Sequence, residues 1–136
     1  MQIQIGAHRT LVEDDVLVVY VSGPLVRAEL TELLGLCEQT AARLGTVYLV
    51  TVVGPGFSLP LDSRKYAAEW GRGHALSGNV IVGAPFAMRA LISILARAAQ
   101  LVGARSTEVV FTATEAEARA FIAQHKRARP PAARPS

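Results

Sequence analysis

The stretch Val-Leu-Val-Val-Tyr-Val at residues 16–21 decides the fold. It is continuously apolar and rich in β-branched residues, which is typical of a strand covered on both faces. A second buried strand is predicted at residues 46–53, and another apolar strand at residues 79–84. Because helical patterns separate these strands, the chain is predicted to form a largely parallel sheet flanked by helices.

The N-terminal part adds an antiparallel element. Residues 3–12 are predicted to form one strand that pairs with residues 16–22, since Glu13-Asp14-Asp15 between two apolar runs is a hairpin signal. A last strand is expected at residues 107–112. The predicted order is therefore β-β-α-β-α-β-α-β-α, an α/β fold with four flanking helices.

Four helices are predicted from apolar spacing and end signals. The first opens at Pro24 and ends at Gly45, as favoured for these residue types. The second is capped by Asp62 or Ser63 and stops near residues 71–73, and the third spans residues 85–103. The last begins with a capping box of Thr114 and Glu117 and turns three apolar side chains inward: Ala118, Phe121 and Ile122.

The length and composition of the chain predict one domain at residues 1–127 and a disordered basic tail at residues 128–136. Residues 126–136 carry four basic side chains and no acid, so the net charge of +3 leaves residues 1–125 at 3 − 4 = −1. A near-neutral body gives no reason to expect a nucleic-acid partner. The single cysteine, Cys37, lies on an apolar helix stripe and is expected to be buried.

The N-terminus lacks the basic region and long apolar run of a secretory signal, so we expect a cytoplasmic protein. The longest apolar stretch, residues 85–103, is interrupted by Arg89 and Arg97. Because a charge in a spanning helix is costly, we expect a buried helix and no membrane span.

Catalytic and metal-binding signatures are missing from the sequence. It contains no phosphate-binding glycine loop, no paired-histidine zinc motif and no nucleophile elbow. His8, His74 and His125 have no partner ligand three or four residues away. We therefore expect no metal, no cofactor and no enzymatic activity, although His74 is the one side chain suited to act as a general base.

The segment from Asp62 to His74 holds the first candidate site. Asp62 and Ser63 start a helix after a parallel strand, where free N–H groups suit a phosphate on a ligand or on Ser63; ordinary helix capping is the alternative. Four further side chains are candidates for contact with a partner or ligand: Arg64, Tyr66, Arg72 and His74, with Trp70 one turn after Tyr66. Tyr66 and Trp70 also fit a role as core anchors.

The helix at residues 85–103 holds the second candidate surface. Its polar residues Arg89, Ser93, Arg97 and Gln100 form one narrow stripe, and apolar residues beginning with Phe86 cover most of the rest. A surface helix needs an apolar face of only about 100°. The surplus indicates a helix wedged between neighbours, lining an apolar pocket or forming a subunit interface, and it favours a homodimer.

Three stretches then resemble a family. These are Tyr66 through His74, Gly83 through Ala90, and Thr112 through Ala118. Together with the order of elements, they resemble stand-alone STAS (SpoIIAA-like) domains and small bacterial SEC14-like proteins. The resemblance implies the SpoIIAA-like fold, and it implies for Asp62-Ser63 the place of the Asp-Ser pair that a kinase phosphorylates in anti-sigma-factor antagonists.

Two functions of different class follow. The first is a non-enzymatic regulatory module that binds a protein partner, as in an anti-sigma-antagonist pathway. The second is a module that binds a small apolar or lipid-like ligand, pairing an apolar tail with the helix at residues 85–103 and an anionic head with Arg64, Arg72, His74 and Arg89.

Overall fold

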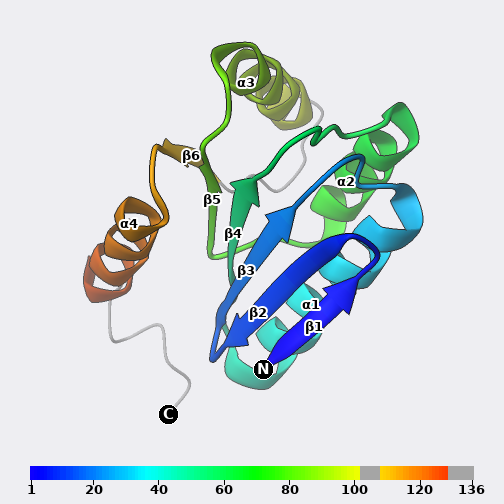
Figure 1. Cartoon of the computed structure of the whole chain (residues 1–136). Coiled ribbons are helices and arrows are strands. Elements are labelled where there is room, and N and C mark those ends of the chain that lie inside the picture. The colour runs from blue at the N-terminus through cyan, green and yellow to red at the C-terminus, as the bar shows by residue number, and fades with distance from the viewer. Residues whose placement is uncertain (102–107, 129–136) are drawn as a thin grey trace.

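The computed structural model of the chain describes residues 1–101 and 108–128 (Figure 1). Within them, six strands form one sheet in sequential order, and four helices flank it. The strands are β1 (Gln2–Ile5), β2 (His8–Glu13), β3 (Val16–Val21), β4 (Tyr48–Val53), β5 (Gly78–Val82) and β6 (Val109–Thr112). The helices are α1 (Arg27–Leu44), α2 (Leu61–Gly73), α3 (Phe86–Leu101) and α4 (Glu115–Ala128). β1, β2 and β3 pair antiparallel and β3 to β6 pair parallel, which confirms the predicted α/β architecture.

The N-terminal run differs from its prediction. Residues 3–12 form parts of two strands, because the chain turns at Gly6 and pairs Ile5 with His8. Gly6 has a φ of +56°, a conformation that glycine adopts without the steric cost that other residues meet. The predicted acidic turn is present, since Glu13 pairs with Val16 across Asp14 and Asp15.

The first helix starts later than predicted. Pro24 does not open α1; it forms an isolated bridge with Ser58, and the helix begins at Arg27. Its predicted end is correct, because Gly45 follows the last turn with a φ of +84° and donates its N–H to the Ala41 carbonyl. Thr114 is confirmed as the cap of α4, since the Glu117 N–H donates to Thr114 Oγ1 at 3.2 Å, and the Glu117 carboxylate in turn accepts a 3.0 Å hydrogen bond from the Thr114 hydroxyl.

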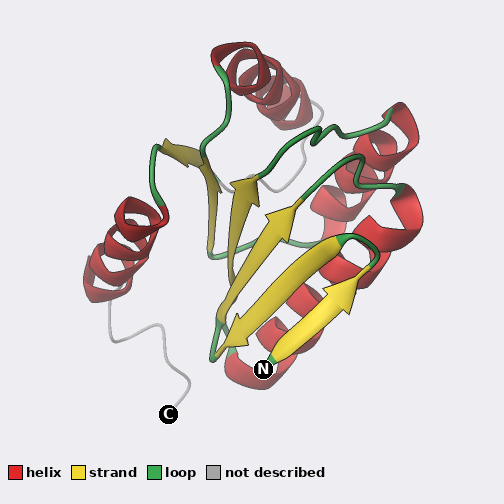
Figure 2. Cartoon of the chain, viewed as in Figure 1, coloured by secondary structure: helices red, strands yellow, loops and turns green. Residues whose placement is uncertain are grey.

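Two apolar clusters hold the layers together, one on each face of the sheet (Figure 2). On one face, α1 packs Leu30, Leu33 and the fully buried Cys37 against β3 and β4, and α2 packs beside α1. Burial raises the pKa of the Cys37 thiol to about 12, with Glu38 adding to the shift. On the other face, α4 covers β4 and β5 with the buried Ala118 and Ile122, while Phe121 is half-buried, as predicted.

The third helix is the exception. None of the α3 side chains that the structure describes is buried, so the expected buried helix is wrong. Figure 1 shows α3 beyond the carboxyl ends of the strands, and β6 is the element it approaches most closely. Because β6 is a four-residue strand at the edge of the sheet, α3 has little sheet surface on which to pack.

Among residues 1–101 and 108–128, no helix has the length and apolarity needed to cross a bilayer. Parts of three predictions lie outside the described residues: the end of the third helix beyond residue 101, the start of the last strand at residue 107, and the tail from residue 129 onward. Ala128, the first residue assigned to that tail, ends α4 instead.

Candidate functional site

The structure places Asp62 and Ser63 inside the first turn of α2, not at its cap. Pro60 holds the N-cap position and the helix starts at Leu61, so the predicted capping role is wrong. Ser63 is 0% exposed, and its hydroxyl donates a 2.7 Å hydrogen bond to the Leu25 carbonyl. Asp62 points to solvent and pairs with Arg27 at 3.1 Å. Phosphorylation of Ser63 therefore requires opening of this turn, and it stays a prediction.

Trp70 and His74 lie close together at the end of α2. Their rings stack at 4.7 Å, and the Glu38 carboxylate of α1 lies 3.0 Å from Trp70 Nε1 and 2.7 Å from His74 Nε2. His74 Nδ1 lies 3.0 Å from the Trp70 carbonyl, so both ring nitrogens of His74 are engaged. These rings border an open cleft of about 360 Å³ between α1 and α2 that also reaches Cys37.

The predicted partner surface does not form one patch. Because α2 runs back along the sheet from the end of β4 to the start of β5, its first and last turns lie at opposite ends of the strands (Figure 1). Arg72 and His74 are exposed at the last turn of α2. Phe86 and Arg89 begin α3 after β5, at the other end. Near that end, Tyr66 packs against the core cluster of α1, with the Arg27 guanidinium 5.2 Å from its ring centre, and Arg64 is half-buried.

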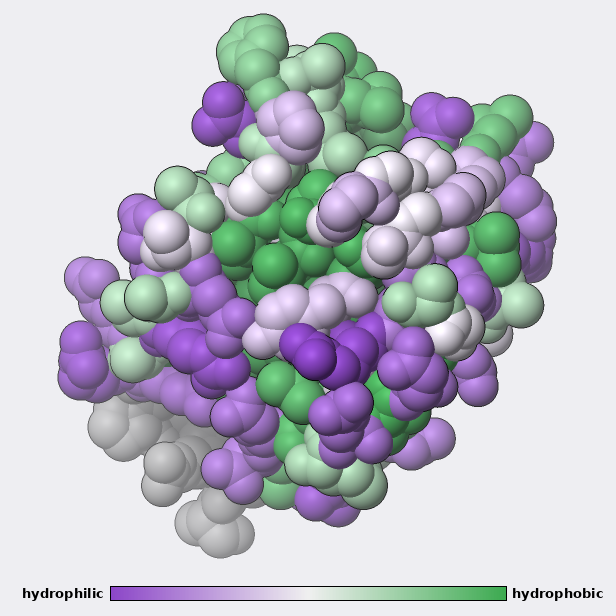
Figure 3. Space-filling model, viewed as in Figure 1, coloured by the Kyte–Doolittle hydropathy of each residue, from purple (hydrophilic) through white to green (hydrophobic). Residues whose placement is uncertain are grey.

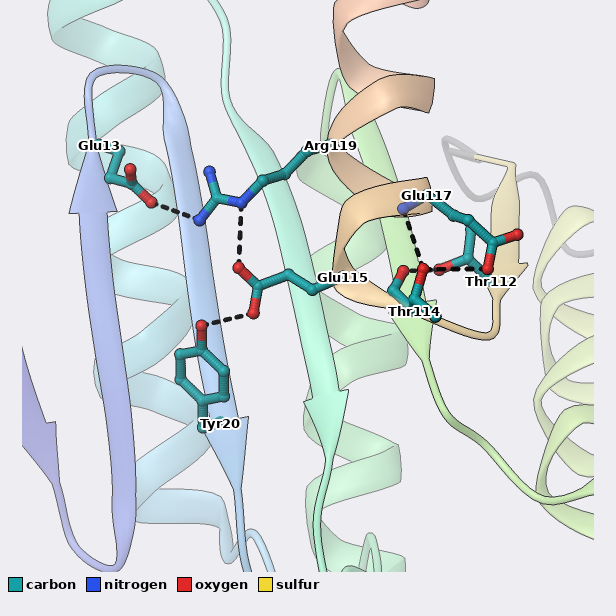
Figure 4. Close-up of polar contacts among 7 residues, drawn as sticks. All are labelled: Glu13, Tyr20, Thr112, Thr114, Glu115, Glu117 and Arg119. Carbon is teal, nitrogen blue, oxygen red and sulfur yellow. Dashed lines mark hydrogen bonds and ion pairs between the residues drawn. The ribbon is translucent and has the colours of Figure 1, made fainter.

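A polar network joins α4 to the sheet (Figure 4). Tyr20 donates a 2.6 Å hydrogen bond to Glu115, and Arg119 bridges Glu115 at 3.0 Å and Glu13 at 2.7 Å. The Arg9 guanidinium lies 4.6 Å from the Tyr20 ring centre. The hydrogen bond to Glu115 raises the pKa of Tyr20, and the same bond, with help from Arg119, lowers the pKa of Glu115. These side chains satisfy one another, which indicates a structural clamp.

This clamp predicts a pH-dependent contribution to stability. We expect Tyr20→Phe to lower the free energy of unfolding by about 1 kcal/mol at pH 7, the usual value for one hydrogen bond. The folded pKa of Glu115 is below its usual 4.5, so this stabilisation is present above pH 4.5 and is lost as the pH falls through the lowered value. Urea unfolding at pH 7 and at pH 3 measures the difference.

Tyr66→Phe is the matched control, because the Tyr66 hydroxyl makes no hydrogen bond within the described residues. Its effect should be small and the same at both pH values. A Tyr20→Phe effect of equal size at pH 7 and pH 3 would contradict the role of Glu115.

The largest unexplained feature is the outward face of α3. Phe86 is 77% exposed, Ile94 63% and Leu101 88%, and Leu91 and Leu95 are exposed as well. Figure 3 shows mostly apolar α3 surface at the top of the view, interrupted by polar groups. Exposed apolar surface of this kind marks interaction sites on folded proteins.

No protein-family model matches the chain, and no curated protein or solved structure is significantly similar to it. The assignment of the candidate site therefore rests on the geometry of the structure alone. Among residues 1–101 and 108–128, no three His, Cys, Asp or Glu side chains are grouped so as to hold a metal ion.

The sequence predicted contacts for Phe86 and Arg89 and showed an apolar surplus on this helix, but it did not distinguish the residues that form the exposed face. These are Ala87, Leu91, Ile94, Ala98 and Leu101, all of them exposed. Their spacing of 4, 3, 4 and 3 residues is the signal that would have found them. The predicted polar stripe, by contrast, runs between this face and the half-buried side chains that face the sheet: Met88, Ile92 and Ala96.

Proposed function

We propose that the chain is a non-enzymatic interaction module, of the regulatory kind that the STAS resemblance implies, and that the outward face of α3 is its docking surface. The observation that carries the proposal is the exposure of α3. A helix of an α/β domain normally buries one apolar stripe on its sheet. Here a second stripe is left exposed on the opposite side.

The α3 surface also has few charges. Arg89 and Arg97 are the charged residues of the helix, and both are exposed. The centre of a protein interface is depleted of charge and enriched in large apolar side chains, while charged groups form the rim. Ile94 and Leu91 lie near the middle of α3 and both arginines lie on the polar stripe beside this face, which fits that arrangement.

Site-specific photo-crosslinking tests the proposal. A benzophenone amino acid is placed at Ile94 in the full chain, expressed in the protein's own cells, with Glu69 on the exposed face of α2 as the control position. We expect an adduct of defined mass at position 94, lost when Leu91 is changed to Glu, and none at position 69. Absence of any adduct at position 94 would contradict docking through α3.

Ligand binding is the second candidate function, and the cleft beside Trp70 and His74 favours it. Its volume of about 360 Å³ falls in the lower part of the range of small-molecule sites. Of the four basic residues proposed to hold an anionic head, His74 lines this cleft, whereas Arg89 lies at the other end of the sheet. A mass spectrum of the intact protein from its own cells under native conditions would show a retained adduct if this function holds.

A further inference from the structure

We propose that the outward face of α3 pairs antiparallel with α3 of a second copy of this chain. This inference depends on the proposed function and names its partner. The face has the pattern of helices that pair with other helices: its residues recur every 3.5 residues on average, as the a and d positions of a coiled coil do. They are Ala87, Leu91, Ile94, Ala98 and Leu101, and they form what we call the α3 seam.

The α3 seam is complementary to itself when reversed. An antiparallel pairing centred between residues 92 and 93 places Leu91 beside Ile94 of the second copy, and Ala87 beside Ala98 of the second copy. The large side chains therefore meet at the centre, and the alanines beyond them let the two backbones approach. Because the interface is isologous, each contact occurs twice.

The ends of the helix support the same orientation. Phe86 and Leu101 carry the two most exposed large apolar side chains of α3 and lie at its opposite ends. In an antiparallel pair, the first turn of one α3 lies beside the last turn of the other. Phe86 of each copy then covers Leu101 of the other, which removes both from water.

The charges are compatible with self-pairing. Arg97 flanks the α3 seam, and in this register it lies near Ala90 of the second copy, not near another arginine. Arg89 points away from the seam, and no acidic residue occurs in residues 86–101.

An anionic membrane surface would also attract two arginines on an apolar helix. Alanines at two of the five seam positions favour a helix partner, because they offer little apolar area to a bilayer.

The available area suits a dimer of modest affinity. The exposed apolar side chains of α3 present on the order of 500 Å² per chain, so pairing two copies buries about 1,000 Å², the lower bound for a specific interface. We therefore expect association at micromolar concentrations.

Sedimentation velocity of the full chain, from about 1 to 200 µM, tests the pairing. We expect the 14.5 kDa chain to approach twice its mass as concentration rises, and Ile94→Glu to weaken association at least 100-fold while keeping the native circular dichroism spectrum. Leu61→Glu is the matched control, because Leu61 is an exposed apolar residue of α2 outside the seam; it should dimerise like the wild type. A wild type that stays monomeric, or a dimer that Ile94→Glu leaves intact, would overturn the proposal.

Disulfide trapping tests the orientation. Ala87→Cys combined with Ala98→Cys should form a covalent dimer under mild oxidation. Each single variant should not, because identical positions lie eleven residues apart along the paired helices, about 16 Å. Cross-linking by the single variants would overturn the antiparallel register.

Failure of self-pairing can be separated from failure of the proposed function. If the chain is monomeric but the photo-crosslinker at Ile94 traps a different protein, only self-pairing is wrong. If the chain is monomeric and the probe traps nothing, both are wrong. Flotation of the monomer with vesicles of phosphatidylglycerol and phosphatidylcholine, lost in Ile94→Glu, would assign the seam to a membrane and overturn the dimer.

Discussion

Replacing Ser63 with Asp is expected to lower the free energy of unfolding by roughly 3–5 kcal/mol, the cost of a buried charge without a partner. The Ser63 hydroxyl is fully buried and donates to the Leu25 carbonyl. A carboxylate there cannot donate, and it would place a negative charge against that carbonyl oxygen. Urea unfolding at pH 7, followed by circular dichroism, measures the loss.

Two variants are the controls. Ser63→Ala removes one buried hydrogen bond and should cost about 1–2 kcal/mol. Asp62→Asn breaks only the exposed pair with Arg27 and should change stability by less than about 1 kcal/mol. A Ser63→Asp protein as stable as the wild type would mean that the first turn of α2 opens easily.

The result bears directly on the predicted phosphorylation. A phosphoryl group carries more charge than a carboxylate and needs more room. If Ser63→Asp is as costly as expected, a phosphate on Ser63 would displace the start of α2 from Leu25. Phosphorylation would then act by releasing this segment, not by adding a charge to an intact surface.

The sheet could be predicted from the sequence because the apolar patterns of its inner strands are compatible with few other structures. A run such as residues 16–21, apolar at every position, fits only a strand with both faces covered, and β3 lies between β2 and β4. The split of residues 3–12 was harder to predict. Its turn at Gly6-Ala7 is not one of the strong hairpin dipeptides, and the turn is recognised only once Ile5 pairs with His8.

The candidate site could not be predicted to the same extent, because burial depends on neighbours that the local pattern does not specify. Ser63 has the residue type of a helix cap, yet Pro60 starts the helix earlier, and the hydroxyl turns into the body of the protein. The apolar surplus of α3 was visible in the sequence. Whether the rest of the fold buries these apolar side chains depends on the position of β6 at the sheet edge.

Replacing His8 with Ala is expected to lower the free energy of unfolding by roughly 3–4 kcal/mol, because it leaves both a cavity and unpaired polar groups. His8 is 1% exposed in β2. Its Nδ1 accepts a hydrogen bond from the Ser22 N–H at 3.1 Å, so Nε2 carries the proton and donates to Glu29 at 3.1 Å. Glu29→Gln is the control, because it keeps a hydrogen-bond acceptor for His8, and it should cost about 1 kcal/mol or less. A larger loss of stability for Glu29→Gln than for His8→Ala would contradict this role of His8.

The same contacts connect β2 to the start of α2. Glu29 also accepts a hydrogen bond from the Val26 N–H at 3.2 Å, and the neighbouring Leu25 carbonyl accepts from Ser63. His8 therefore helps to fix the segment on which Ser63 depends. We expect the double variant of His8→Ala and Ser63→Ala to lose less stability than the sum of the single variants, by at least about 0.5 kcal/mol. Strict additivity in urea unfolding would show that the two hydrogen bonds are independent, and that release of α2 leaves the N-terminal strands unaffected.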